Sequence, residues 1–91
     1  MNGTGQATLI NAVGLHARPS VKLTQAAKGF TARIEFALSP DGPWTDAKSP
    51  VKVMRVKASK GATLYFRSDG ADAEAAVRAL VDLVNRKFDE E

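Results

Sequence analysis

Residues 31–38 read TARIEFAL, and their strict alternation of apolar and polar side chains decides the fold. Ala32, Ile34, Phe36 and Leu38 point to one side of an extended chain, while Thr31, Arg33 and Glu35 point to the other. A period of two over this length predicts a β-strand with one buried face. Residues 62–68 (ATLYFRS) repeat the pattern and send Ala62, Leu64 and Phe66 inward. The chain therefore builds a sheet with one apolar face that other elements must cover.

Two further strands are expected beside these. Residues 6–12 form a weaker strand candidate, in which the side chains of both Leu9 and Ile10 are expected to be buried. Residues 39–44 (SPDGPW) are typical of a turn. The short segment 44–47 follows Pro43 and suits an edge strand, where a missing N–H leaves the ladder intact.

Three segments have the pattern of helices. Residues 72–87 place apolar side chains at helical spacing, with acidic residues at the start and basic residues at the end, as the helix dipole favours. Residues 17–28 form a second helix, with Gly29 in the C-cap position. Residues 50–56 form a third, with Ser49 as its N-cap and Pro50 as its first residue.

The resulting order is strand, helix, strand, strand, helix, strand, helix. It predicts one α+β domain over residues 1–91, an open-faced β-sandwich with the three helices on one face of the four-stranded sheet and water on the other. Core packing is expected for the following large side chains: Phe30, Phe36, Trp44, Phe66 and Leu80.

Composition excludes several classes of protein. The 91 residues allow one modest core, which rules out an enzyme with separate cofactor and substrate lobes. The absence of cysteine removes disulfide scaffolds, thiolate zinc sites and thiol nucleophiles. No signal segment or membrane span is found, so a soluble, cytoplasmic protein is expected. The net charge of +3 favours acidic partners but does not select among proteins, phosphates and nucleic acid.

The most informative stretch is residues 14–20, GLHARPS, which contains the only histidine of the chain. His16 lies where a strand ends and a helix begins, and helix N-termini bind phosphate through free N–H groups, here those of Ala17 and Arg18. The Arg18 guanidinium adds a permanent charge, Gly14 permits a sharp turn, and Pro19 is tolerated in the first helical turn. An imidazole in this setting can attack phosphorus with no metal or cofactor. The alternative is a histidine that only caps the helix or is solvated.

The motif GLHARPS resembles the active-site signature of the HPr family, the histidine phosphocarriers of the bacterial phosphoenolpyruvate-dependent phosphotransferase system. The likeness continues through residues 27–30 (AKGF), 47–49 (AKS), Gly61, Gly70 and 76–80. It implies a βαββαβα fold with an antiparallel sheet. It also implies that His16 accepts a phosphoryl group on Nδ1 with help from Arg18. Enzyme I is the implied donor and IIA-type proteins the implied acceptors. Such a protein is a carrier without independent turnover, and we expect a monomer.

Some residues depart from the pattern of the sugar-transport carriers. Val13 stands where many of them have Asn, and the loop before Trp44 is about two residues longer than in compact members. NAVGLHARPS (11–20) and VNRKFDEE (84–91) look closer to the nitrogen-related NPr branch. The resemblance thus leaves open whether the protein serves sugar transport or nitrogen-related regulation.

Ser49 matches the family position that HPr kinase phosphorylates in some bacteria. The simpler interpretation, which we favour, is that Ser49 only caps its helix. The resemblance also implies a docking surface for enzyme I and IIA on the first two helices, with apolar residues inside a basic rim. Its predicted members, besides Arg18, are Val21, Lys22, Lys48, Val51, Lys52 and Arg55.

Two other functional classes compete. Residues 48–61 (KSPVKVMRVKASKG) are rich in lysine and arginine, and an outward Tyr65 could stack on a base, as in a small nucleic-acid-binding module. The scarcity of exposed aromatic residues argues against that class, and neither nucleic acid nor a membrane is predicted as a partner. A regulatory binding module without phosphoryl transfer would share the fold but survive loss of His16.

Overall fold

The computed structural model describes residues 2–90 and confirms the βαββαβα order. The elements are β1 (Asn2–Thr8), α1 (Arg18–Lys28), β2 (Arg33–Ala37), β3 (Thr45–Asp46), α2 (Pro50–Arg55), β4 (Thr63–Asp69), α3 (Ala73–Asn85) and a short 3-10 turn, η1 (Lys87–Asp89). The four strands form one antiparallel sheet in the order β1-β4-β2-β3. Within residues 2–90 no helix is long and apolar enough to cross a bilayer.

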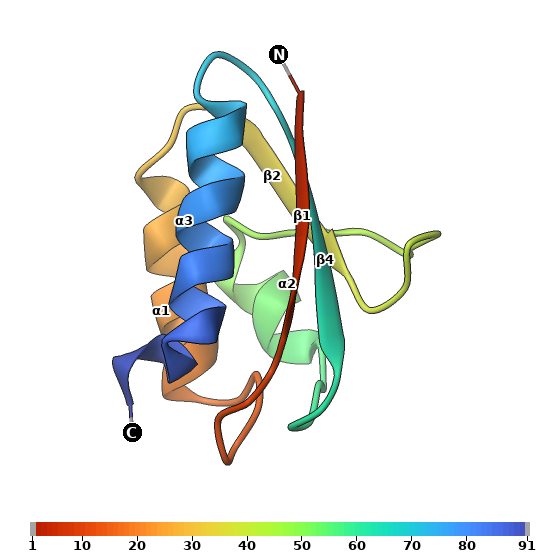
Figure 1. Cartoon of the computed structure of the whole chain (residues 1–91), viewed down its shortest axis with the longest axis vertical. Coiled ribbons are helices and arrows are strands. Elements are labelled where there is room, and N and C mark those ends of the chain that lie inside the picture. Colours follow the sequence, from red (N-terminus) through yellow and green to blue (C-terminus); the bar gives the residue numbers. More distant parts are fainter. Residues whose placement is uncertain (1, 91) are drawn as a thin grey trace.

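The strand register gives the sheet two different faces. Gly5, Phe66 and Phe36 stand side by side in one row, and Phe66 and Phe36 are fully buried. The neighbouring row contains Thr4, Arg67 and Glu35, whose side chains point the other way. All three helices lie on the Phe36 side (Figure 1). The predicted open-faced sandwich is therefore confirmed.

The predicted first strand, 6–12, was wrong, because the strand is Asn2–Thr8. Its inward positions include Gly3 and Gly5, which carry no apolar signal. A Cβ at Gly3 would lie 2.8 Å from the carbonyl oxygen of Ala73, and one at Gly5 would lie 2.7 Å from Val77 Cγ1. Glycine is thus required by the close approach of β1 to α3. Leu9 is buried as expected, but Ile10 is exposed.

The expectations for residues 37–44 also need correction. Ala37 is buried and Leu38 is 46% exposed, so the alternation of this strand ends one residue early. Residues 38–44 then extend to the side of the sheet away from the helices (Figure 1). Trp44 consequently lies outside the helix-side core, with the Arg67 guanidinium 4.0 Å from its ring centroid in a cation–π contact. Trp44 therefore partly covers the face that was expected to be open to water.

The end of α3 differs from the predicted helix 72–87. The helix stops at Asn85, and residues 87–89 all have positive φ. This turn points Phe88 into the core, where it is fully buried. The other ends are close to prediction: α1 starts at Arg18 after Ala17 as N-cap, α2 ends at Arg55, and Gly29 and Ser49 are the expected caps.

Asp72 connects the start of α3 to the start of the second strand. Its carboxylate accepts hydrogen bonds from the backbone N–H groups of Thr31 at 2.9 Å and Ala32 at 2.8 Å. These bonds favour the charged carboxylate, the Thr31 bond most, and hold its pKa below the usual 3.8.

Acid should therefore weaken the fold through Asp72. A folded-state pKa below the unfolded value means that the stabilisation is present above about pH 4 and is lost as pH falls through the lowered pKa. Asp72→Asn should accordingly be less stable than the wild type at pH 7 and should show a smaller further loss toward pH 3. Urea denaturation at both pH values measures the difference. Equal pH dependence of the two proteins would contradict it.

Candidate functional site

The loop that carries His16 is anchored to the segment before β4. Leu9 N–H donates to Ala62 O at 2.8 Å, and Gly61 N–H donates to Leu9 O at 2.8 Å. Leu15 N–H donates to Ala58 O at 2.9 Å, and the Leu15 side chain is buried. His16 thus follows directly after a fixed, buried residue, and its own side chain is exposed.

Asn11 and Gly14 close the turn before this anchor. The buried Asn11 side chain donates from Nδ2 to Gly14 O at 2.8 Å, and Gly14 N–H donates to Asn11 O at 3.2 Å. Gly14 has φ +66, and a Cβ there would lie 2.4 Å from Ala58 O. The expected role of Gly14 in a sharp turn is confirmed. Asn11 was missed in the sequence, where only its spacing to Gly14 could have marked it.

Ala17 is the N-cap of α1 and has φ 47 and ψ −117. A residue with a Cβ is strained in this region, at a cost of about 1–3 kcal/mol. Alanine also has no side-chain oxygen to cap the first helical turn. Pro19 is buried in that turn, where it has no N–H to satisfy. The helix start next to His16 therefore lacks an internal cap, as an anion-binding terminus requires.

Ala17→Gly should stabilise the protein, because glycine adopts φ 47 without strain. We expect a net gain of about 0.5–2 kcal/mol after the larger entropy loss of glycine on folding is subtracted. Denaturant midpoints measure the change. As a control, the exposed helical Ala75→Gly should lose about 1 kcal/mol. Equal losses in both variants would show that Ala17 is not strained.

Arg18 is the first residue of α1 and lies two positions after His16. Its side chain is 79% exposed, and Nε lies 3.6 Å from Oε1 of Glu90. Lys22, one turn further along α1, is engaged more tightly: Nζ lies 2.6 Å from Oε2 of Glu90 and donates to Phe88 O at 2.8 Å. Of these two predicted cations, Arg18 is therefore the less constrained.

The predicted docking residues are not equally available. Val21 and Val51 are exposed, as are Lys52 and Arg55, which agrees with an accessible apolar centre and basic rim. Met54 is 56% exposed on α2 and was missed, although its spacing of three from Val51 places the two on one helix face. Lys48 is half-buried, and its Nζ donates to Phe30 O at 2.6 Å, so its charge is partly used within the protein.

Ser49 is confirmed as the N-cap of α2, because its Oγ accepts a hydrogen bond from Lys52 N–H at 3.4 Å. Lys48 contacts Phe30 beyond the end of α1, whereas Ala58, just beyond α2, pairs with Leu15. The two helices thus run in opposite directions. Since the 11 residues of α1 span about 16 Å, Ser49 lies at the end of this surface away from His16.

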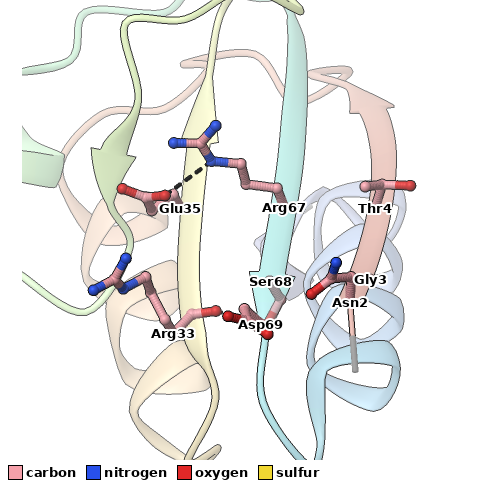
Figure 2. Close-up of a pocket in the computed structure, with 8 residues that line it drawn as sticks. All are labelled: Asn2, Gly3, Thr4, Arg33, Glu35, Arg67, Ser68 and Asp69. Carbon is pink, nitrogen blue, oxygen red and sulfur yellow. Dashed lines mark hydrogen bonds and ion pairs between the residues drawn. The ribbon is translucent and has the colours of Figure 1, made fainter.

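The other face of the sheet has a shallow cavity of about 330 Å³ that involves none of these residues. Arg33, Glu35, Arg67 and Asp69 line it, and Arg67 Nε donates to Glu35 Oε1 at 2.9 Å (Figure 2). Tyr65, which the nucleic-acid alternative needs as a stacking platform, is half-buried beside Pro40 and Trp44 on this face. Among the described residues, the cavity on this face is lined by both acidic and basic side chains, and Tyr65 is not fully exposed as a stacking platform would be.

Comparison with known proteins decides the family. Residues 4–86 match the family model described as "PTS HPr component phosphorylation site". The chain belongs to the HPr family. It is 42% identical over 83 residues to the phosphocarrier protein HPr of Cupriavidus necator, with 91% of each chain covered. The expected family and fold are confirmed, and the protein is an HPr-type phosphocarrier of the phosphotransferase system.

Solved HPr structures agree. The crystal structure of HPr-C-His from Thermoanaerobacter tengcongensis is 35% identical and superimposes with a TM-score of 0.87, covering 97% of both chains. An HPr dimer from the same organism is 37% identical, with a TM-score of 0.71 over 82% of this chain and 84% of that one. Dimers therefore occur among its HPr neighbours, and the monomer expected for this chain stays a prediction.

Proposed function

We propose that His16 is the residue on which this HPr-type carrier holds its phosphoryl group. Phosphorylated enzyme I is the donor and IIA-type proteins are the acceptors. The lone pair of Nδ1 of His16 attacks phosphorus, the new N–P bond forms, and the bond between phosphorus and the histidine of enzyme I breaks, with the electron pair returning to that imidazole. The same exchange, with His16 as the leaving group, delivers the phosphoryl group. No water, metal or cofactor takes part.

One observation carries this proposal: the exposed imidazole of His16 is next to a helix start without a side-chain cap and two residues from the exposed guanidinium of Arg18. Backbone N–H groups of Ala17 and Arg18 and the Arg18 charge stabilise the oxygens of the arriving group. The anchored backbone at Leu15 supports this proposal, because it fixes the position of the residue directly before His16. Preorganised donors need no reorientation at the moment of transfer.

Reversible delivery requires that the carrier bind its phosphoryl group only moderately. An interaction that stabilises the phosphorylated state more than the transition state slows the second transfer. Arg18 suits this requirement, because it is exposed and a solvated ion pair contributes about 0–1 kcal/mol. An open, solvated site is thus better for a carrier than a buried one.

Docking would use the face around His16. Val21, Val51 and Met54 give an exposed apolar centre, and Lys52 and Arg55 give the basic rim. Such a surface buries its apolar centre against a partner while its charges speed and orient the encounter with an acidic surface. Lys22 and Lys48 contribute less charge because both are engaged within the protein.

The test is incubation with phosphoenolpyruvate and purified enzyme I, followed by intact mass measurement and acid treatment. We expect one acid-labile phosphate per chain. Capture with the phosphorylated protein should then retrieve a IIA-type acceptor, whose identity separates sugar transport from nitrogen-related regulation. A wild-type chain that enzyme I does not phosphorylate would contradict the proposal.

Three further points belong to the same proposal. The protein acts in the cytoplasm, where phosphoenolpyruvate is made. It acts as a monomer, which size-exclusion chromatography with light scattering tests. Ser49 serves as a helix cap, and its modification by HPr kinase stays a prediction. Because hydroxyl esters of phosphate resist acid and phosphohistidine does not, acid treatment distinguishes a phosphate on Ser49 from one on His16.

A further inference from the structure

The segment after α3 is packed across the start of α1. Figure 1 shows the end of the chain beside the lower end of α1. Phe88 is fully buried in the core, and its carbonyl oxygen accepts the hydrogen bond from Lys22 Nζ at 2.8 Å. Neither of these two contacts involves the Glu90 side chain. We therefore expect the segment to stay attached when Glu90 is substituted.

Glu90 is the carboxylate that this packing delivers to the site. It lies 2.6 Å from Lys22 Nζ and 3.6 Å from Arg18 Nε, and its side chain is only 20% exposed. The hydrogen bond from Lys22, followed by the charges of Arg18 and Lys22, lowers the pKa of Glu90. Glu90 is thus negatively charged at neutral pH. Its partner Arg18 is the residue proposed to stabilise the phosphoryl group on His16.

We propose that Glu90 is a positioning residue for phosphoryl transfer: it holds Arg18 in the unphosphorylated carrier and releases it to the phosphoryl group on His16. The proposal rests on His16 being the phosphorylated residue. The reason is that the Arg18 guanidinium can pair with either of two anions. One is the Glu90 carboxylate and the other is the phosphoryl group proposed on His16. No covalent bond of Glu90 forms or breaks.

The exchange has a direct effect on transfer. In the unphosphorylated protein, Glu90 orients Arg18 and offsets its charge. In the phosphorylated protein, Glu90 repels the phosphoryl group and loses its ion pair with Arg18, the weaker of its two ion pairs. Both effects reduce the stability of the phosphorylated carrier. An ion pair of about 0.5–1 kcal/mol, the upper half of the range for exposed pairs, corresponds to an effect on rate and equilibrium of about two- to fivefold. Glu90 would thus keep the phosphoryl group easy to pass on.

The test compares Glu90→Gln with Asp89→Asn. Both variants remove one negative charge from neighbouring residues, but Asp89 is exposed and pairs with Arg86 at 3.1 Å instead of Arg18. Phosphoramidate serves as a donor that needs no docking protein: its P–N bond breaks, ammonia leaves, and the N–P bond of His16 forms. Intact mass spectrometry follows the rate, and enzyme I with phosphoenolpyruvate gives the transfer equilibrium.

We expect Glu90→Gln to be phosphorylated about two- to fivefold faster than the wild type and to shift the equilibrium with enzyme I toward the carrier by a similar factor. Asp89→Asn should match the wild type. The difference should fade in 1 M salt, where charges are screened. In an Arg18→Gln background, Glu90→Gln should have no further effect, since its partner is already gone.

Each other result overturns the proposal in a recognisable way. Equal rates for Glu90→Gln and Asp89→Asn, or a slower Glu90→Gln with an unchanged melting temperature, would mean that Glu90 does not restrain Arg18. A Glu90→Gln effect that persists without Arg18 would mean that Glu90 acts directly on the phosphoryl group. A wild-type chain that neither donor phosphorylates would overturn both this inference and the proposed function, whereas the first three outcomes leave the latter intact.

Discussion

His16→Ala should abolish acid-labile phosphorylation by enzyme I and phosphoenolpyruvate, with no signal above background. The chain has one histidine, so no other imidazole can accept the group. The variant should also fail to pass phosphate to a IIA-type acceptor. Intact mass before and after acid treatment gives the result. Acid-labile phosphate on His16→Ala would show that the nucleophile has been wrongly assigned.

Two comparisons make this result specific. The His16 side chain is exposed, so the alanine variant should have the circular dichroism and melting temperature of the wild type. Arg18→Gln should instead retain transfer at a rate lower by about two- to fivefold, because the exposed Arg18 makes only a solvated ion pair with a group that His16 itself binds. If the protein were instead a regulatory module that only binds partners, His16→Ala would still bind them. Partner capture with the wild type and with His16→Ala distinguishes this alternative from phosphoryl transfer.

Gly14→Ala should strongly destabilise the protein and impair transfer together. Its Cβ would meet Ala58 O at 2.4 Å, a distance that atoms in proteins do not adopt, and the residue would be held at φ +66. Relief requires the 58–59 backbone to move, which breaks the Leu15–Ala58 pair that anchors the site. We expect a loss of about 3 kcal/mol or more, at the upper end for single substitutions. Urea denaturation and the phosphorylation rate measure the two effects.

Gly61 provides the matched control for this prediction. It also has positive φ, at +99, but nothing lies within 4 Å of a Cβ built there. Gly61→Ala should therefore cost only the conformational penalty of about 1–2 kcal/mol. The excess loss in Gly14→Ala then measures the close contact with Ala58. Equal losses at the two positions would mean that the Gly14 turn adapts easily and that the site does not depend on this anchor.

Much of the fold could be predicted because the signals are local. The alternation over residues 31–38 and 62–68 marks two strands, and helical spacing and cap residues mark three helices. The residues of the proposed site are equally local: Gly14, His16, Arg18 and Pro19 lie within six positions of sequence, although His16 lies on a loop between β1, which ends at Thr8, and α1 and not directly at the end of a strand as expected. Recognition of the family from this motif was confirmed by the match over residues 4–86.

The incorrect predictions share a physical cause, which is that the deciding partner lies far away in sequence. β1 was displaced because Gly3 and Gly5 are selected by contact with α3 and carry no apolar signal. Trp44 has an aromatic side chain that would suit either face, and only the course of the 38–44 loop and the position of Arg67 place it on the outer one. Phe88 was missed because the helical pattern ends before it.

The sequence by itself determined the element order, the polar and apolar faces of the central strands and the closeness of His16 and Arg18 along the chain, since each depends on residues within a turn or a strand of one another. Only the tertiary structure decided which charges are available. Lys22 and Phe88 are 66 positions apart, yet their hydrogen bond brings Glu90 to Arg18. Burial of Phe88 stabilises that contact, and chain reversal through residues 87–89 makes it reachable. Burial and chain reversal depend on the whole core, so no local pattern contains them.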